Sequence, residues 1–311
     1  MYASDLVMVS NLFSRLNHNG LEEEFKVLYP RMKFFSEKDR EDYPGLIKKI
    51  VEDIRPKALI LNSGDGGTHV FLSVLFSMYE PGDPRIPPLV VLPGGTINVH
   101  ASAVGHRGVL LSRPKAIMEQ VIGSRYLAEG NLETLTSNLL SVDDGEIRRV
   151  GCTVANGAVS RYFEEYIHDS GFWKAVGQIG KRSSVFVLRE LFQERYGEYF
   201  PLEEMAFGWE GKEVRDNFHG FAAYSVPFGI VGFHLPHEGE GLHVLATDFE
   251  GRRKFLRNFV GGVTGTGYNF EVDASMERLV VENPGVYVFD GDLYHANRLE
   301  ISTIPVTYVK L

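Results

Sequence analysis

Two glycine-rich segments, each at the end of an apolar run, carry the residues best suited to chemistry. The first segment is Ser63-Gly-Asp-Gly-Gly-Thr68, and the second is Pro93-Gly-Gly-Thr-Ile-Asn98. Consecutive glycines let backbone N–H groups point toward one spot without Cβ atoms in the way, and a following helix adds the positive end of its dipole. Both segments therefore predict loops that bind phosphate, with the backbone of Gly64 to Thr68 and of Gly95 to Asn98 around the ligand.

Asp65 lies at the centre of the first segment. A carboxylate would repel a bare phosphate, so Asp65 fits this loop only if it holds a cation or a ligand hydroxyl, most simply Mg²⁺ or a ribose. The glycines alone would also fit a tight turn between a strand and a helix. The second loop favours the binding site, and the two loops together predict a pocket for a nucleoside triphosphate.

Neither segment matches the common phosphate motifs. No Lys-Ser/Thr pair follows the glycines, as the Walker pattern requires, and the glycine spacing differs from that of the dinucleotide fingerprint. The sequence therefore indicates another kind of phosphate site.

In this pairing of loops the sequence resembles the catalytic domain of the diacylglycerol, sphingosine and ceramide kinases, above all their bacterial soluble relatives. The family's first loop reads Gly-Gly-Asp-Gly-Thr, which stands here as Ser63 to Gly67, with Thr68 one place late. The second motif, Pro-x-Gly-Thr-x-Asn, is matched from Pro93 to Asn98. NAD kinases and phosphofructokinases share the first loop and lack the second, so the lipid kinase branch is favoured.

The resemblance implies ATP-dependent transfer of the γ-phosphoryl group to the hydroxyl of a diacylglycerol-like or sphingosine-like lipid. Asn11 and Ser14 stand at the family's first nucleotide loop, and Asp290-Gly-Asp292 stands at its Asp-Gly-Glu, whose acidic end is the proposed base. Glu240 lies in a weakened form of an Asp-Gly-Leu segment near a magnesium site. The implied catalytic residues are Asp65 and Asp292, the Mg²⁺ ligands Asp65 and Glu240, and the ATP-binding residues Asn11, Ser14, Gly64, Gly66, Gly67, Thr68, Gly95, Thr96 and Asn98.

Several departures from the family pattern fall in the site. Gly67 stands at the family's Thr, Val70 replaces an acidic residue, Leu12 and Arg15 replace a Pro and a Gly, and Asp292 is one methylene shorter than Glu. Asp65 and Asp292 also have a structural alternative, because Asp in a glycine-flanked turn often binds backbone. Two other functions stay open: a nucleotide-binding regulator without transfer, and a kinase of a soluble acceptor.

The order of elements predicts two domains. Apolar strands alternate with helices in the first part, which predicts an α/β domain with a parallel sheet over residues 1–127. The expected strands are Leu6 to Val9, Met32 to Phe35, Ala58 to Leu61 and Leu89 to Leu92, with helices near Glu22, Gly45 and Val70.

After about Leu127 the pattern becomes period-two runs separated by turns. Asp144-Gly145 predicts a hairpin, and residues 128–311 are expected to form an antiparallel β-sandwich. A helical insertion is expected near 171–195, where Lys181 and Arg182 lie among large apolar residues. This helix would suit contact with a membrane surface, although packing against the sheet explains the same apolar residues.

Composition excludes several classes of protein. The net charge is −9, from 32 basic and 41 acidic residues, which argues against a nucleic-acid partner. The single cysteine, Cys152, excludes a disulfide framework and predicts a small core residue. No apolar stretch reaches the roughly 18 residues of a spanning helix. We therefore expect a cytoplasmic protein. The family resemblance implies a lipid substrate, the basic segment near 171–195 would allow transient contact with the membrane surface, and the sequence leaves a homodimer open.

Overall fold

The structure is a computed structural model whose described part consists of two compact units. Unit 1 comprises Met1–Leu139, Arg149–Gly151 and Ile304–Leu311, and unit 2 comprises Leu140–Arg148 and Cys152–Thr303. The described residues are 5–11, 21–37, 42–94, 99–104, 133–157, 159–160, 164, 202–226, 229–230, 233–234, 241–248, 257, 270 and 272–310.

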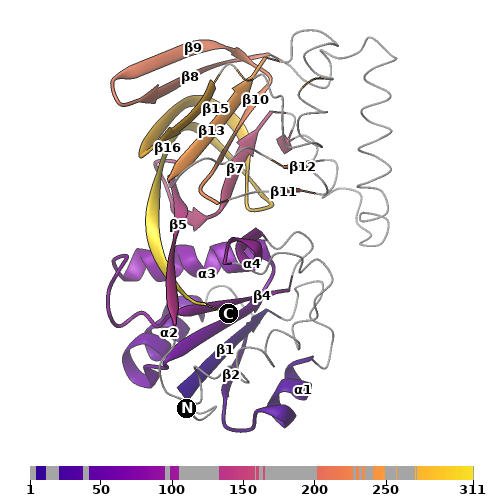
Figure 1. Cartoon of the computed structure of the whole chain (residues 1–311), viewed down its shortest axis with the longest axis vertical. Coiled ribbons are helices and arrows are strands. Elements are labelled where there is room, and N and C mark those ends of the chain that lie inside the picture. Colours follow the sequence, from indigo (N-terminus) through magenta and orange to yellow (C-terminus); the bar gives the residue numbers. More distant parts are fainter. Residues whose placement is uncertain are drawn as a thin grey trace. The chain divides into compact units, whose positions relative to one another are not determined.

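Unit 1 has a parallel sheet with strand order β16-β4-β3-β1-β2 (Figure 1). Its strands are β1 (Leu6–Asn11), β2 (Lys33–Glu37), β3 (Ala58–Ser63), β4 (Leu89–Pro93) and the end of β16 (Asp292–Val309). Its helices are α1 (Leu21–Leu28), α2 (Tyr43–Lys48), the π-helix η3 (Lys49–Ile54), α3 (Asp65–Met78) and α4 (Val99–Ala103).

The strands β1, β3 and β4 are buried on both faces of the sheet, which explains why each of them contains a continuous apolar run. Leu6, Met8 and Ile60 share one face with Phe25 of α1, and they form a single cluster. Their neighbours Val7 and Leu61 point to the opposite face and are at most 2% exposed. A strand buried on both sides can be read directly from its continuous apolar run.

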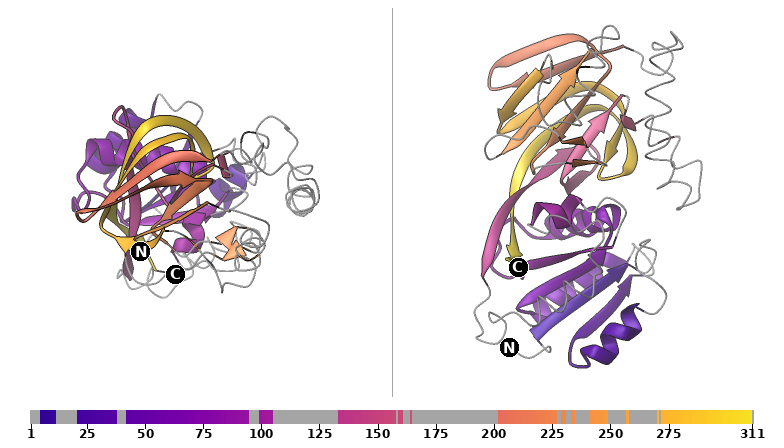
Figure 2. Two further views of the ribbon diagram at one scale, coloured as in Figure 1. Left: turned by 90° about the horizontal axis from the view of Figure 1, so that it is seen from above. Right: turned by 45° about the vertical axis from the view of Figure 1, so that its right-hand side comes forward.

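Unit 2 consists of antiparallel strands packed around one core (Figure 2). The path β14-β13-β10-β7-β15-β16 runs through it, and β8 pairs with β15 and with β9. The strands not yet bounded are β5 (Thr134–Asp143), β6 (Arg148–Gly151), β7 (Thr153–Asn156), β8 (Glu203–Trp209), β9 (Lys212–Phe218), β10 (Gly220–Tyr224), β11 (Gly229–Ile230), β12 (Phe233–His234), β13 (Leu242–Thr247), β14 (Val272–Met276) and β15 (Arg278–Phe289).

The predicted fold class is confirmed, since parallel strands come first in the chain and antiparallel strands follow. Gly145, with φ of 88°, turns the chain between β5 and β6, where a hairpin was predicted. The linear division into domains differs from the structure in several places, because unit 1 extends to Leu139 and also includes Arg149–Gly151 and Ile304–Leu311, all of which lie in the predicted second domain. Ile304–Leu311 belong to unit 1, because β16 continues until Tyr308 pairs with Leu89 of β4. The expected boundary at residue 127 and the helical insertion near 171–195 lie outside the described residues.

The long hairpin of β15 and β16 carries a group of exposed ion pairs. Glu300 accepts hydrogen bonds from Arg278 and Arg298, and Arg298 also contacts Glu282 at 3.1 Å. The hydrogen bond from Arg278, followed by that from Arg298, holds the pKa of Glu300 below its ordinary value. These pairs are exposed, so their contribution to stability is small.

The lowered pKa predicts a small dependence of stability on pH. The ion pairs stabilise the fold above the ordinary pKa of Glu, about 4.3, and this stabilisation is lost as the pH falls through the lowered value. We expect Glu300→Gln to lower the free energy of unfolding by about 0.5–1 kcal/mol at neutral pH. Urea unfolding should show that this difference disappears near pH 3, with the exposed Glu277→Gln as control. A difference that persists in acid would contradict the ion-pair explanation.

Among the helices in the described part of the chain, none has the length and apolarity needed to cross a membrane.

Candidate functional site

The candidate site is built at the carboxyl ends of three neighbouring parallel strands. Ser63 at the end of β3 is in register with Pro93 at the end of β4, and the N–H of Gly94 donates to the carbonyl of Ser63 at 3.0 Å. On the other side of β3, Ser10 of β1 is in register with Asn62. Asn11, the last residue of β1, therefore lies beside the glycine loop that follows β3. Because these strands are parallel, their carboxyl ends meet at one edge of the sheet, where open α/β sheets bind ligands.

The first glycine loop opens directly into helix α3. Gly64 is the N-cap, in extended conformation with φ of −78° and ψ of 175°, and it has no side chain that could cap the helix. The N–H of Thr68 donates to the carbonyl of Gly64 at 2.9 Å, which makes it part of the helix ladder. The N–H groups of Asp65, Gly66 and Gly67 precede that ladder and lie at the positive end of the helix dipole. The backbone N–H of Thr68 is therefore used within the helix. Of the two phosphate contacts predicted for Thr68, the one that remains is the contact through its hydroxyl.

Asp65 links the two glycine loops. It occupies the first position of α3, and its Oδ1 accepts a hydrogen bond of 3.1 Å from the N–H of His100 in α4, just after the second loop. A carboxylate here is favoured by both helix N-termini. Asp65 therefore has a structural role in the fold, and this role is compatible with the predicted contact with Mg²⁺.

Two buried hydroxyls lie in this region without a hydrogen-bond partner among the described residues. They are Ser63 Oγ, in a residue 7% exposed, and Thr68 Oγ1, in a residue 1% exposed. An unsatisfied buried hydroxyl costs about 1–3 kcal/mol, so such groups commonly mark a ligand or water site. Hydroxyl donors beside a helix N-terminus suit the oxygens of a polyphosphate, so the site fits the predicted nucleotide.

A second group of functional candidates lies in the turn between β15 and β16. Phe289 and Asp292 pair across a two-residue loop, in which Asp290 and Gly291 have φ of 46° and 96°. Two positive φ angles define a type I′ hairpin turn, for which Asp-Gly is a preferred sequence. The motif that was predicted to carry the base is thus a rigid turn that sets the position of Asp292.

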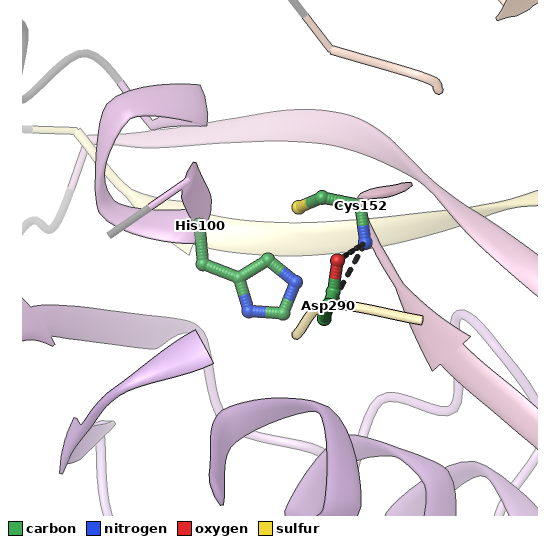
Figure 3. Close-up of side chains that lie close together, drawn as sticks. All are labelled: His100, Cys152 and Asp290. Carbon is green, nitrogen blue, oxygen red and sulfur yellow. Dashed lines mark hydrogen bonds between the residues drawn. The ribbon is translucent and has the colours of Figure 1, made fainter. Parts of the chain in front are cut away.

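The side chain of Asp290 fixes this turn to strand β7 and the residue before it. Its carboxylate accepts hydrogen bonds from the N–H of Cys152 at 2.9 and 3.1 Å, which Figure 3 shows as dashed lines. It also accepts from the N–H and the hydroxyl of Thr153, at 2.9 and 3.0 Å. Asp290 is only 6% exposed, so these donors take the place of water around its charge. Asp290 therefore positions the turn.

Replacement of Asp290 by Ala is expected to destabilise the protein by about 3 kcal/mol, because it leaves several buried donors without an acceptor. Urea unfolding measures this loss. Asp143→Ala is the matched control, because Asp143 also accepts a backbone N–H in a hairpin turn but is exposed. A loss for Asp290→Ala no larger than for Asp143→Ala would show that the carboxylate does not hold the turn.

The structure describes about half of the predicted site residues. Asn11, Gly64, Asp65, Gly66, Gly67 and Thr68 gather at the start of α3, whereas Asp292 is half-buried at the start of β16. Ser14, Gly95, Thr96, Asn98 and Glu240 lie outside the described residues. Ser63 was not among the predicted residues. The sequence feature that could have indicated Ser63 is a pair of differences from the family motif, four residues apart. Ser63 stands in place of a Gly of the motif, and Gly67 stands in place of its Thr.

Solved structures share this fold over almost the whole chain. Three chains from Bacillus anthracis str. Sterne match, one described as a diacylglycerol kinase and two assigned to that activity only provisionally. Two are 11% identical, with TM-scores of 0.59 and 0.65, over 98% of this chain and 96% of theirs. The third is 13% identical, with a TM-score of 0.61, over 98% of both chains. At these identities the likeness establishes the fold.

A family model matches part of the sequence of unit 1. Residues 14–127 match the diacylglycerol kinase catalytic domain, and this segment contains both glycine loops and Asp65. The predicted resemblance is thereby confirmed, and the match supports a function of the lipid kinase type. A comparison with curated proteins gave no match.

Proposed function

We propose that the protein is a kinase that transfers the γ-phosphoryl group of ATP, as its Mg²⁺ complex, to a lipid hydroxyl of the diacylglycerol or sphingosine type. The observation that carries the proposal is the start of α3, where a glycine N-cap, Asp65 and two buried hydroxyls lie together inside the segment that matches the catalytic domain. This arrangement supports a polyphosphate ligand with a bound cation.

Each residue has a role in the proposal. The N–H groups of Asp65, Gly66 and Gly67 and the hydroxyl of Thr68 would hold phosphate oxygens, and Asn11 would add an amide contact. The Asp65 carboxylate would hold Mg²⁺, which offsets charge on the phosphate oxygens when it is bound. By the motif alone, Asp292 is assigned as the acceptor of the lipid hydroxyl proton.

The experiment that tests this function uses ATP labelled at the γ-phosphate, Mg²⁺ and mixed micelles of diacylglycerol, sphingosine or ceramide. Label in an extracted lipid that depends on Asp65 would support the lipid kinase and name its substrate class. Nucleotide binding in calorimetry without label in any lipid would contradict the lipid assignment and favour a regulator or a kinase of a soluble acceptor. Absence of nucleotide binding would contradict the site itself.

A further inference from the structure

Ser63 and Gly67 are matched to each other in three dimensions. A Cβ added to Gly67 would lie 2.1 Å from Ser63 Oγ and 3.4 Å from Ser63 Cβ, so the hydroxyl points toward the first turn of α3. The same point lies 2.7 Å from Nδ2 of Asn11. Contacts under 3.0 Å are essentially never made by a real Cβ. The Ser63 hydroxyl thus occupies the space in which a side chain at position 67 would begin.

This geometry connects two departures from the motif Gly-Gly-Asp-Gly-Thr. The motif has no side chain at the position of Ser63 and a hydroxyl-bearing side chain at the position of Gly67, and this chain has the reverse. Because the two side chains would compete for one space, a Thr at position 67 would force the Ser63 hydroxyl out of the position that it holds. The two differences therefore form one exchange rather than two separate losses.

We propose that Ser63 Oγ is a phosphate-binding hydroxyl of this site and supplies, from the end of β3, the hydroxyl that the motif places in the first turn of α3. The inference rests on the proposed function, because the ligand is the polyphosphate of a nucleotide. In this role the hydroxyl donates its hydrogen bond to a non-bridging phosphate oxygen. Its burial without a partner among the described residues is independent support, since a hydroxyl that served only packing would carry a cost with no gain.

The first test is Ser63→Ala, measured by titration calorimetry with Mg²⁺-ADP, Mg²⁺-ATP and inorganic phosphate, and by the melting temperature without ligand. We expect nucleotide affinity to fall about tenfold, as for one hydrogen bond to a charged group. The melting temperature without ligand should stay the same or rise, because a buried hydroxyl without a partner has been removed.

Ser225→Ala is the matched control. Ser225 is 6% exposed, and its hydroxyl also has no hydrogen-bond partner in the described part of the chain, but it lies in unit 2. Its replacement should leave nucleotide affinity unchanged. An equal loss of affinity in both variants would overturn the inference, and so would a melting temperature of Ser63→Ala that falls together with its affinity, because the hydroxyl would then be structural.

The second test is the exchange itself. Gly67→Thr alone should weaken nucleotide binding by about tenfold or more, because its Cβ would lie 2.1 Å from Ser63 Oγ and 2.7 Å from Asn11 Nδ2, so that both groups must turn away from the positions they hold. The double variant Ser63→Gly with Gly67→Thr recreates the motif and should bind Mg²⁺-ADP more tightly than Gly67→Thr alone, since one hydroxyl has replaced the other and the displacement of Asn11 Nδ2 is common to both variants. A single variant Gly67→Thr that binds as well as the double variant would overturn the exchange.

The outcomes separate this inference from the proposed function. If the natural protein binds nucleotide and Ser63→Ala binds it equally well, the role of Ser63 is wrong and the kinase proposal stands. If affinity for inorganic phosphate falls tenfold while affinity for both nucleotides is unchanged, the hydroxyl binds free phosphate and the nucleotide role is wrong. If the natural protein binds no nucleotide, both proposals fail together.

Discussion

Asp65→Asn is expected to lower phosphoryl transfer on the order of 10³-fold while the fold is preserved. Asparagine has nearly the same shape, and its carbonyl oxygen can still accept the hydrogen bond from the N–H of His100, which is 3.1 Å from Oδ1 of Asp65. What the substitution removes is the negative charge, and with it the attraction for Mg²⁺. Transfer of label from γ-phosphate ATP measures the loss, and the melting temperature shows whether the fold is intact.

Asp65→Ala separates the two roles of this residue. It removes the charge together with the acceptor that joins α3 to α4, so we expect the loss of transfer to be accompanied by a lower melting temperature, corresponding to about 1–2 kcal/mol. If Asp65→Asn kept turnover within tenfold of the natural protein while Asp65→Ala was destabilised, Asp65 would be a structural link between the loops. The metal role would then be wrong.

The parts of the fold that could be predicted are those in which local sequence and final environment agree. Ala58 to Leu61, the first four residues of β3, are apolar because both faces of the strand are buried. Asp144-Gly145 turns a hairpin because the turn requires φ above zero at Gly145. In such places each residue type is set by its immediate surroundings. The sequence alone therefore predicted the strand, its loop and the helix α3 that follows.

The parts that could not be predicted depend on contacts between distant residues. The carboxylate of Asp290 binds the N–H groups of Cys152 and Thr153, which no local pattern indicates. The end of β16 pairs with β4 of unit 1, although the sequence near Tyr308 resembles any other strand. Even the relation between the close pair Ser63 and Gly67 cannot be seen in the sequence, because it depends on the direction in which the Ser63 hydroxyl points.

The anchored turn clarifies what a shorter acid at position 292 requires. A general base must come within about 2.6–3.2 Å of the proton-bearing atom, directly or through one water. Asp has one methylene less than the Glu of the family motif, so the backbone must provide the missing reach. The turn that precedes Asp292 is fixed by the hydrogen bonds of Asp290 and by positive φ angles at both central residues. The backbone of Asp292 therefore has little freedom to shift toward the lipid hydroxyl.

Asp292→Asn is therefore expected to lower turnover about 10²–10⁴-fold, the usual contribution of general base catalysis, while nucleotide affinity changes less than threefold. The amide keeps the shape of the side chain and removes its ability to accept a proton. Asp292→Glu is the matched variant, because it restores the family's acid in the same turn and should retain at least a tenth of the natural turnover. Rates from labelled ATP and affinities from calorimetry separate the two effects. If Asp292→Asn slows turnover by less than threefold, or weakens nucleotide binding as much as it slows turnover, then Asp292 is not the proton acceptor.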